Sequence, residues 1–102
     1  IAGKYFSNKT LTCANEKVNY VHRDDVISAV KYSIKNDLEG IYNLCSPVHL
    51  CKKEIYDYNA KKYDFLSVHF SSKKEYKERI INSDKLIKEG FSYLYSSPKD
   101  YI

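Results

Sequence analysis

Two stretches of the chain place apolar residues at helical spacing, and short β-branched and aromatic runs alternate with them. The first stretch predicts a helix over about 25–36, and the second predicts a helix over about 52–63. Asp24 or Asp25 is a suitable N-terminal cap for the first helix, because a carboxylate accepts from exposed backbone N–H groups. The apolar residues of this helix are Val26, Ala29, Val30 and Ile34, with Ile27 beside them.

Four short runs have the composition of β-strands. They cover residues 18–22, 41–45, 65–70 and 91–95. A short helix is predicted over about 83–89, closed by Gly90, and Ser71 to Glu78 form a charged connector. This alternation predicts an α/β fold with a small mixed sheet and two main helices. With 102 residues, we expect a single domain over 1–102.

Composition narrows the classes of function. The formal net charge is +4, but 15 of the 17 basic residues are Lys, which is typical of a solvated surface rather than of a nucleic-acid binder. No apolar stretch approaches the length of a membrane span, and no secretory leader is visible. The three cysteines imply no disulfide framework, so a cytoplasmic setting is expected. Because the first residue is Ile1, the chain is expected to be a fragment, a processed product or a trimmed piece.

Three small groups of residues are candidates for chemistry. Cys45, His49 and Cys51 are dense in metal ligands, but their spacing does not match a structural zinc site, so no metal is predicted. Cys51 followed by Glu54 imitates a capping box, which makes a helix cap the preferred interpretation over a nucleophile. The adjacent acids Asp24 and Asp25 are interpreted as helix-start residues rather than as a catalytic pair.

His22 and Arg23 form a more informative pair. They follow a predicted strand and precede a predicted helix, the position at which open α/β sheets place binding residues. Arg23 is one of two arginines and can bind an anion through two N–H groups. Pairing of Arg23 with a neighbouring Asp at the surface is an equally weighted alternative.

No complete active site is visible in the sequence. The chain has three scattered glycines and no glycine-rich phosphate loop. A Tyr-x-x-x-Lys spacing occurs three times, which is about what chance gives for this composition. The instances are Tyr5–Lys9, Tyr58–Lys62 and Tyr95–Lys99.

Several segments in order resemble one protein family. The string VNYVHRDDVISAV (18–30) resembles the segment near Val-His-Val-Asp-Asp-Val in extended short-chain dehydrogenase/reductase proteins, the NAD-dependent epimerase/dehydratase family. Residues 40–44 resemble its Gly-x-Tyr-Asn-hydrophobic strand, and 46–56 the stretch that leads from it into a helix. Residues 79–97 resemble its closing Arg-x-x-Asn-x-Lys-Leu to Tyr-Pro-Ser region, with Ser96 where the family often has Pro. The resemblance runs from about Ala2 to Tyr101.

The resemblance implies that this chain corresponds to only one part of a family member. The family's dinucleotide loop and catalytic Tyr-x-x-x-Lys lie upstream of the matched region and are absent here, so the chain resembles the C-terminal, substrate-side part of a Rossmann-type epimerase. By analogy Asn19, His22 and Arg23 would border the substrate cleft. NAD or NADP would bind the N-terminal part of the full-length protein and not this chain, and the substrate would be a sugar nucleotide or similar small molecule.

Two consequences are expected from the resemblance. This chain alone should be inactive, and it should expose an apolar surface that a missing N-terminal part or self-association covers. The alternative is a stand-alone small α/β binding or interaction module without catalysis, with a polar surface throughout. Neither interpretation involves nucleic acid or a membrane.

Overall fold

The computed structural model describes residues 1–71 and 78–102. These residues divide into two compact units. Unit 1 comprises Ile1–Val18, Leu50–Arg79 and Ile102, and unit 2 comprises Asn19–His49 and Ile80–Tyr101. The predicted charged connector over Ser71 to Glu78 falls mostly on 72–77, outside the described residues.

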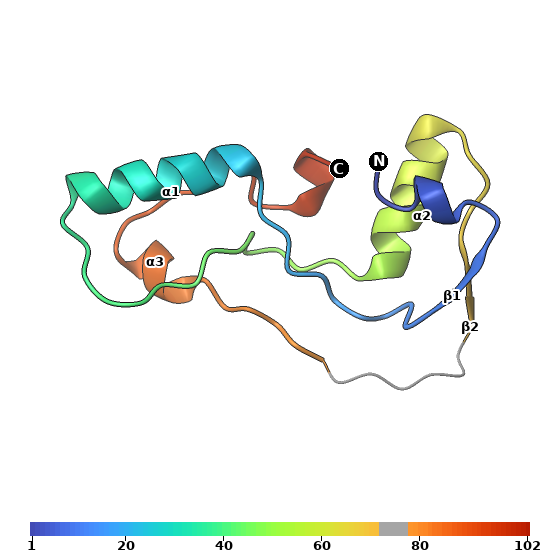
Figure 1. Cartoon of the computed structure of the whole chain (residues 1–102), viewed down its shortest axis with the longest axis horizontal. Helices are drawn as coiled ribbons and strands as arrows, with labels where there is room; N and C mark the ends of the chain where they lie inside the picture. The colour runs from blue at the N-terminus through green and yellow to red at the C-terminus, as the bar shows by residue number, and fades with distance from the viewer. Residues whose placement is uncertain (72–77) are drawn as a thin grey trace. The chain divides into compact units, whose positions relative to one another are not determined.

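Unit 1 holds a two-stranded parallel sheet (Figure 1). Strand β1 (Thr10–Thr12) pairs with β2 (His69–Ser71), and Leu11 lies opposite Phe70. The α/β class predicted from the sequence is thereby confirmed. The expected strand over 65–70 is formed only at its end, as β2, while β1 lies in a stretch where no element was predicted.

Helix α2 (Lys52–Tyr63) begins and ends where local chemistry dictates. Cys51 is its N-cap and pairs reciprocally with Glu54 in a capping box, which confirms the cap interpretation of this thiol. Asp64 ends the helix in the left-handed conformation, with φ of 55°. The Lys52 ammonium lies 2.5 Å from a Glu16 carboxylate oxygen, and this pairing raises the pKa of Lys52.

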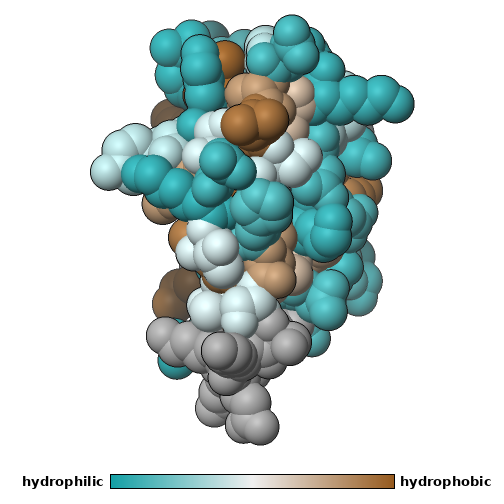
Figure 2. Space-filling model, turned by 90° about the vertical axis from the view of Figure 1, so that its right-hand side faces the viewer, coloured by the Kyte–Doolittle hydropathy of each residue, from teal (hydrophilic) through white to brown (hydrophobic). Residues whose placement is uncertain are grey.

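An aromatic ladder links α2 to its neighbours in unit 1. Tyr56 stacks with Phe70 of β2 and with Phe6 of the 3₁₀-helix η1 (Lys4–Phe6), at ring-centroid distances of 6.0 and 6.4 Å. Gly3 sits against the Tyr56 ring with φ of +88°, so a side chain there would meet ring carbons 2.9 Å away. The face of the molecule in Figure 2 is mainly hydrophilic, with apolar residues in small separate groups.

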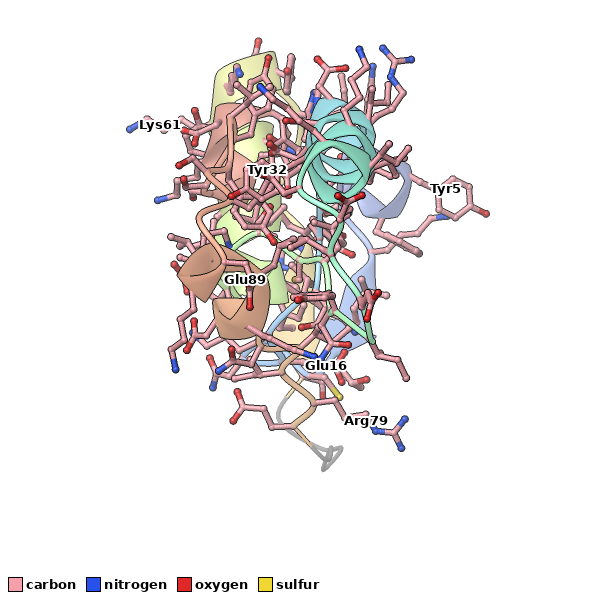
Figure 3. All side chains as sticks on the ribbon, turned by 90° about the vertical axis from the view of Figure 1, so that its left-hand side faces the viewer. Tyr5, Glu16, Tyr32, Lys61, Arg79 and Glu89 are labelled. Atoms are coloured by element: carbon pink, nitrogen blue, oxygen red, sulfur yellow. The ribbon has the colours of Figure 1, made fainter. Side chains whose placement is uncertain are left out.

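Unit 2 is built around helix α1 (Arg23–Lys35) and the short helix α3 (Asp84–Lys88). Its core combines Ala29 of α1, Leu86 of α3 and Phe91. The Tyr32 hydroxyl donates to the Glu89 carbonyl oxygen at 2.6 Å, which fastens α1 to the end of α3 (Figure 3). A second 3₁₀-helix, η2 (Pro98–Asp100), lies near the end of the chain.

The predicted strands over 18–22, 41–45 and 91–95 are wrong. In the structure these segments form no strands. In 41–45 and 91–95, side chains take hydrogen bonds that a sheet ladder would use: the Cys45 N–H donates to the Tyr93 hydroxyl at 3.3 Å, and the Leu94 N–H donates to Asp25 Oδ1 at 2.7 Å. Strand-like composition gives a pleated, half-buried segment, but only a backbone partner turns such a segment into a strand.

Helix α1 matches its prediction in position but not in the side that it buries. Ala29 is 5% exposed and Asp25 fully buried, whereas Val30 is 55% and Ile34 73% exposed. Most of the apolar stripe read from the sequence therefore faces outward. No helix among the described residues is long and apolar enough to cross a membrane.

Candidate substrate-facing site at the start of helix α1

His22 is the N-cap of α1. Its Nδ1 accepts a hydrogen bond from the Asp24 backbone N–H at 2.9 Å, so the ring proton sits on Nε2. The prediction that Asp24 or Asp25 caps this helix is wrong. The helix begins at Arg23, so both acids already lie inside the first turn, and the imidazole satisfies the exposed N–H instead.

Two tyrosines fix the His22 ring in unit 2. The ring centroid lies 4.0 Å from that of Tyr95, with an interplanar angle of 30°, and 5.2 Å from that of Tyr101, nearly edge-on. The side chain is 24% exposed. The cap and the two ring contacts fix the orientation of the imidazole ring, so its Nε2–H is a hydrogen-bond donor with a set direction. Such a donor suits a hydroxyl or an anionic oxygen.

Asp25 joins the start of α1 to residues 94 and 95. Its fully buried carboxylate accepts from the Leu94 N–H at 2.7 Å and from the Tyr95 N–H at 3.1 Å. As the third residue of α1, it also lies at the positive end of the helix dipole. This carboxylate therefore joins the 91–95 segment to the start of α1 and places Tyr95 beside His22.

The two other predicted site residues flank His22 in the sequence. The Arg23 side chain is 85% exposed, and its Nε lies 3.8 Å from Asp24 Oδ1, the surface pairing that the sequence left open. Such an exposed pair is weak, so the guanidinium remains available to an anion. The Asn19 side chain accepts from the Ile81 N–H at 2.9 Å and thus joins two backbone segments of unit 2 that are distant in sequence. A substrate-binding role for the three residues stays a prediction.

The sequence did not reveal a buried polar group that contacts Tyr101, one of the two rings packed on His22. Ser46 is fully buried, and its Oγ lies 2.9 Å from the Tyr101 hydroxyl and 3.4 Å from the Tyr95 carbonyl oxygen. Burial raises the pKa of Tyr101, although the Ser46 hydrogen bond opposes this effect. The only signal was the Ser46-Pro47 turn, because a Ser–Tyr contact over 55 residues leaves no local pattern.

The surroundings of the Cys45 thiol disfavour its ionised form. The Cys45 thiol donates to the Tyr20 carbonyl oxygen at 3.4 Å, and burial raises its pKa, which favours the neutral thiol over the reactive thiolate. None of the three cysteines forms a disulfide bond. Across the described ranges, no three His, Cys, Asp or Glu side chains converge as a metal site would require.

The residues present do not fit a dinucleotide. A phosphate-binding loop needs clustered glycines between a strand and a helix, but the glycines of this chain are far apart and serve turns. Gly90, with φ of +100°, lies under the Tyr32 hydroxyl, which an added Cβ would approach to 2.5 Å. Gly3 serves a similar turn beside Tyr56.

The chain is similar in sequence to Protein YeeZ from two strains of Escherichia coli. No family model matches the chain, and no solved structure matches it. The chain is 32% identical over 99 residues to Protein YeeZ of Escherichia coli K12, a match that covers 94% of this chain. The match to Protein YeeZ of Escherichia coli O157:H7 has the same identity and coverage. The chain spans 36% of the length of these curated relatives.

Proposed function

We propose that this chain is the substrate-side part of a longer, cytoplasmic NAD(P)-dependent epimerase/dehydratase-like protein, inactive alone. The observation that carries the proposal is the ordered series of family-like segments along the chain. The match to a longer relative supports it, because 94% of this chain aligns with only 36% of that protein. The relative's name states no activity, so the reaction class rests on the resemblance.

In the proposed protein this chain binds and orients the substrate. Arg23 supplies an exposed guanidinium for an anionic group such as the diphosphate of a sugar nucleotide. His22 supplies the Nε2–H donor, held by its cap and by Tyr95. Asn19 positions the backbone at the edge of the site through Ile81. NAD or NADP would be bound by the rest of the protein and would supply the redox chemistry.

The stand-alone binding module remains the competing hypothesis. It expects a polar surface throughout, whereas Ile34 is 73% and Ile41 85% exposed. An exposed apolar surface of this kind favours a chain that is covered by another part of a protein.

Dinucleotide binding separates the two hypotheses. NADH and NADPH fluorescence should not change with the 102-residue chain, and should change on binding to the protein of the longer reading frame. A frame without such binding, or the lack of any longer frame, would contradict the proposal.

Substrate contact is tested at Arg23. In the longer protein, Arg23→Gln should weaken nucleotide-sugar binding by about 10- to 100-fold, because a charge-assisted hydrogen bond contributes about 1.5–3 kcal/mol. Arg79→Gln removes the same charge elsewhere and is the matched control. Equal effects of the two substitutions would show that Arg23 does not contact the substrate.

A further inference from the structure

One side of helix α1 is apolar and open to solvent. Val26, Val30 and Ile34 are four residues apart, and Ile27 lies beside them. Their exposed fractions are 37%, 55%, 73% and 48% in the order Val26, Val30, Ile34, Ile27. Side chains four residues apart share a helix face. We call these four residues the α1 stripe; its β-branched side chains have little conformational entropy to lose on burial.

A shallow hollow continues the α1 stripe on one side. It has a volume of about 290 Å³ and lies between Val30 and Ile34 of the stripe and Tyr42, Leu44 and Leu86. Its lining is almost entirely apolar. The stripe and the hollow together form one apolar surface within unit 2.

A small-molecule ligand fits this surface poorly. Ligand pockets are usually about 300–1,000 Å³ and carry several converging polar groups. The polar side chains here are already engaged: the Ser33 hydroxyl donates to the Ala29 carbonyl oxygen at 2.8 Å, and the Tyr42 ring receives the Lys85 ammonium at 4.4 Å. The hollow is therefore shaped for apolar side chains of another protein segment.

Contact area argues against a second copy of the chain. The 13 residues of α1 make a cylinder about 20 Å long and about 10–12 Å wide, so the α1 stripe offers a footprint of about 200–250 Å². A stable dimer buries about 800 Å² on each partner. A segment of the same polypeptide needs far less area, because tethering removes most of the cost of association.

We infer that the α1 stripe is the docking face for the remainder of a longer polypeptide that includes this chain. This inference rests on the proposed function, which supplies the longer polypeptide. The relative's length agrees with it, since about two thirds of that protein lies outside the aligned part. The partner surface is apolar and carries side chains that enter the hollow beside Val30 and Ile34.

Thiol accessibility tests the docking directly. Ile34→Cys reports on the α1 stripe, and Lys35→Cys, on the exposed polar side of the same turn, is the matched control. Both are made with Cys13→Ser, because the other two native thiols are buried. Labelling by a maleimide is followed by peptide-resolved mass spectrometry, in the 102-residue chain and in the protein of the longer reading frame.

The inference expects similar labelling rates at the two positions in the 102-residue chain. In the longer protein, the Ile34→Cys thiol should react at least tenfold more slowly than the Lys35→Cys thiol. Equal rates in the longer protein would overturn the inference, as would protection in the 102-residue chain that grows with its concentration, which would identify a second copy. If Ile34→Cys prevents folding, Val26→Cys provides the same test.

NADH and NADPH binding, measured on the same preparations, separates this inference from the proposed function. Protection of the stripe without dinucleotide binding would retain the docking face and overturn the enzyme class. Dinucleotide binding without protection would overturn the docking face alone.

Discussion

Removing the Asp25 carboxylate should destabilise the chain more than any other single polar substitution in unit 2. Asp25→Ala leaves the Leu94 and Tyr95 N–H groups, whose hydrogen bonds to the carboxylate are partly buried, without their acceptor. An unsatisfied buried donor costs about 1–3 kcal/mol, and two donors lose their acceptor here. Because these donors are only partly buried, the expected loss lies in the lower half of a range of about 2–6 kcal/mol. A domain of this size has a total free energy of unfolding of about 5–15 kcal/mol, so this loss is a large share.

Urea unfolding of the 102-residue chain, followed by circular dichroism, measures this loss. Asp24→Ala is the matched control, since Asp24 lies in the same helical turn with its side chain 44% exposed, and should cost under about 1 kcal/mol. Asp25→Asn should fall between the two, because an amide keeps one acceptor oxygen but turns N–H groups toward the other donor. A loss below about 1 kcal/mol for Asp25→Ala would refute the assigned role of the carboxylate.

Two further predictions concern backbone strain and alkaline pH. Gly90→Ala should lower the free energy of unfolding by more than about 2 kcal/mol, because positive φ and the Tyr32 hydroxyl both oppose a Cβ. Gly40→Ala, with φ of +95° and only an ordinary contact to the Lys85 ammonium at 3.7 Å, should cost only about 1–2 kcal/mol. If urea titrations gave the same loss of unfolding free energy for both variants, the contact with the Tyr32 hydroxyl would contribute nothing to the cost of Gly90→Ala. Burial raises the folded-state pKa of Cys45 and Tyr101, so the stability that they contribute is complete below their ordinary values of 9.0 and 10.0 and declines as pH rises through the folded values. Urea midpoints from pH 7 to 11 should show this decline, and a combined Cys45→Ala and Tyr101→Phe variant should flatten it; an unchanged slope would contradict the assignment.

Helix positions could be predicted because their signals are local. Helix α2 has its predicted bounds, because Cys51, Glu54 and the apolar spacing all lie within a few residues of one another. Helix α1 was displaced by two residues at its start, because an imidazole cap is harder to recognise than the carboxylates of Asp24 and Asp25.

The sheet and the site could not be predicted to the same extent. β1 pairs with β2 across 59 residues, and nothing local in Thr10–Thr12 identifies its partner. The sequence drew attention to His22, but the residues that hold its ring, Tyr95 and Tyr101, are more than 70 residues away. Periodicity revealed the apolar stripe of α1 but not that Asp25, rather than Ile34, faces inward.

The order in which the chain visits the two units limits how it can be divided. It passes from one unit to the other after Val18, His49, Arg79 and Tyr101. Removing either half of the sequence would therefore leave both cores incomplete, unlike truncation between tandem domains. An exchange of part of the coding sequence at any internal point would disrupt both cores for the same reason. We therefore expect the two units to be inherited together.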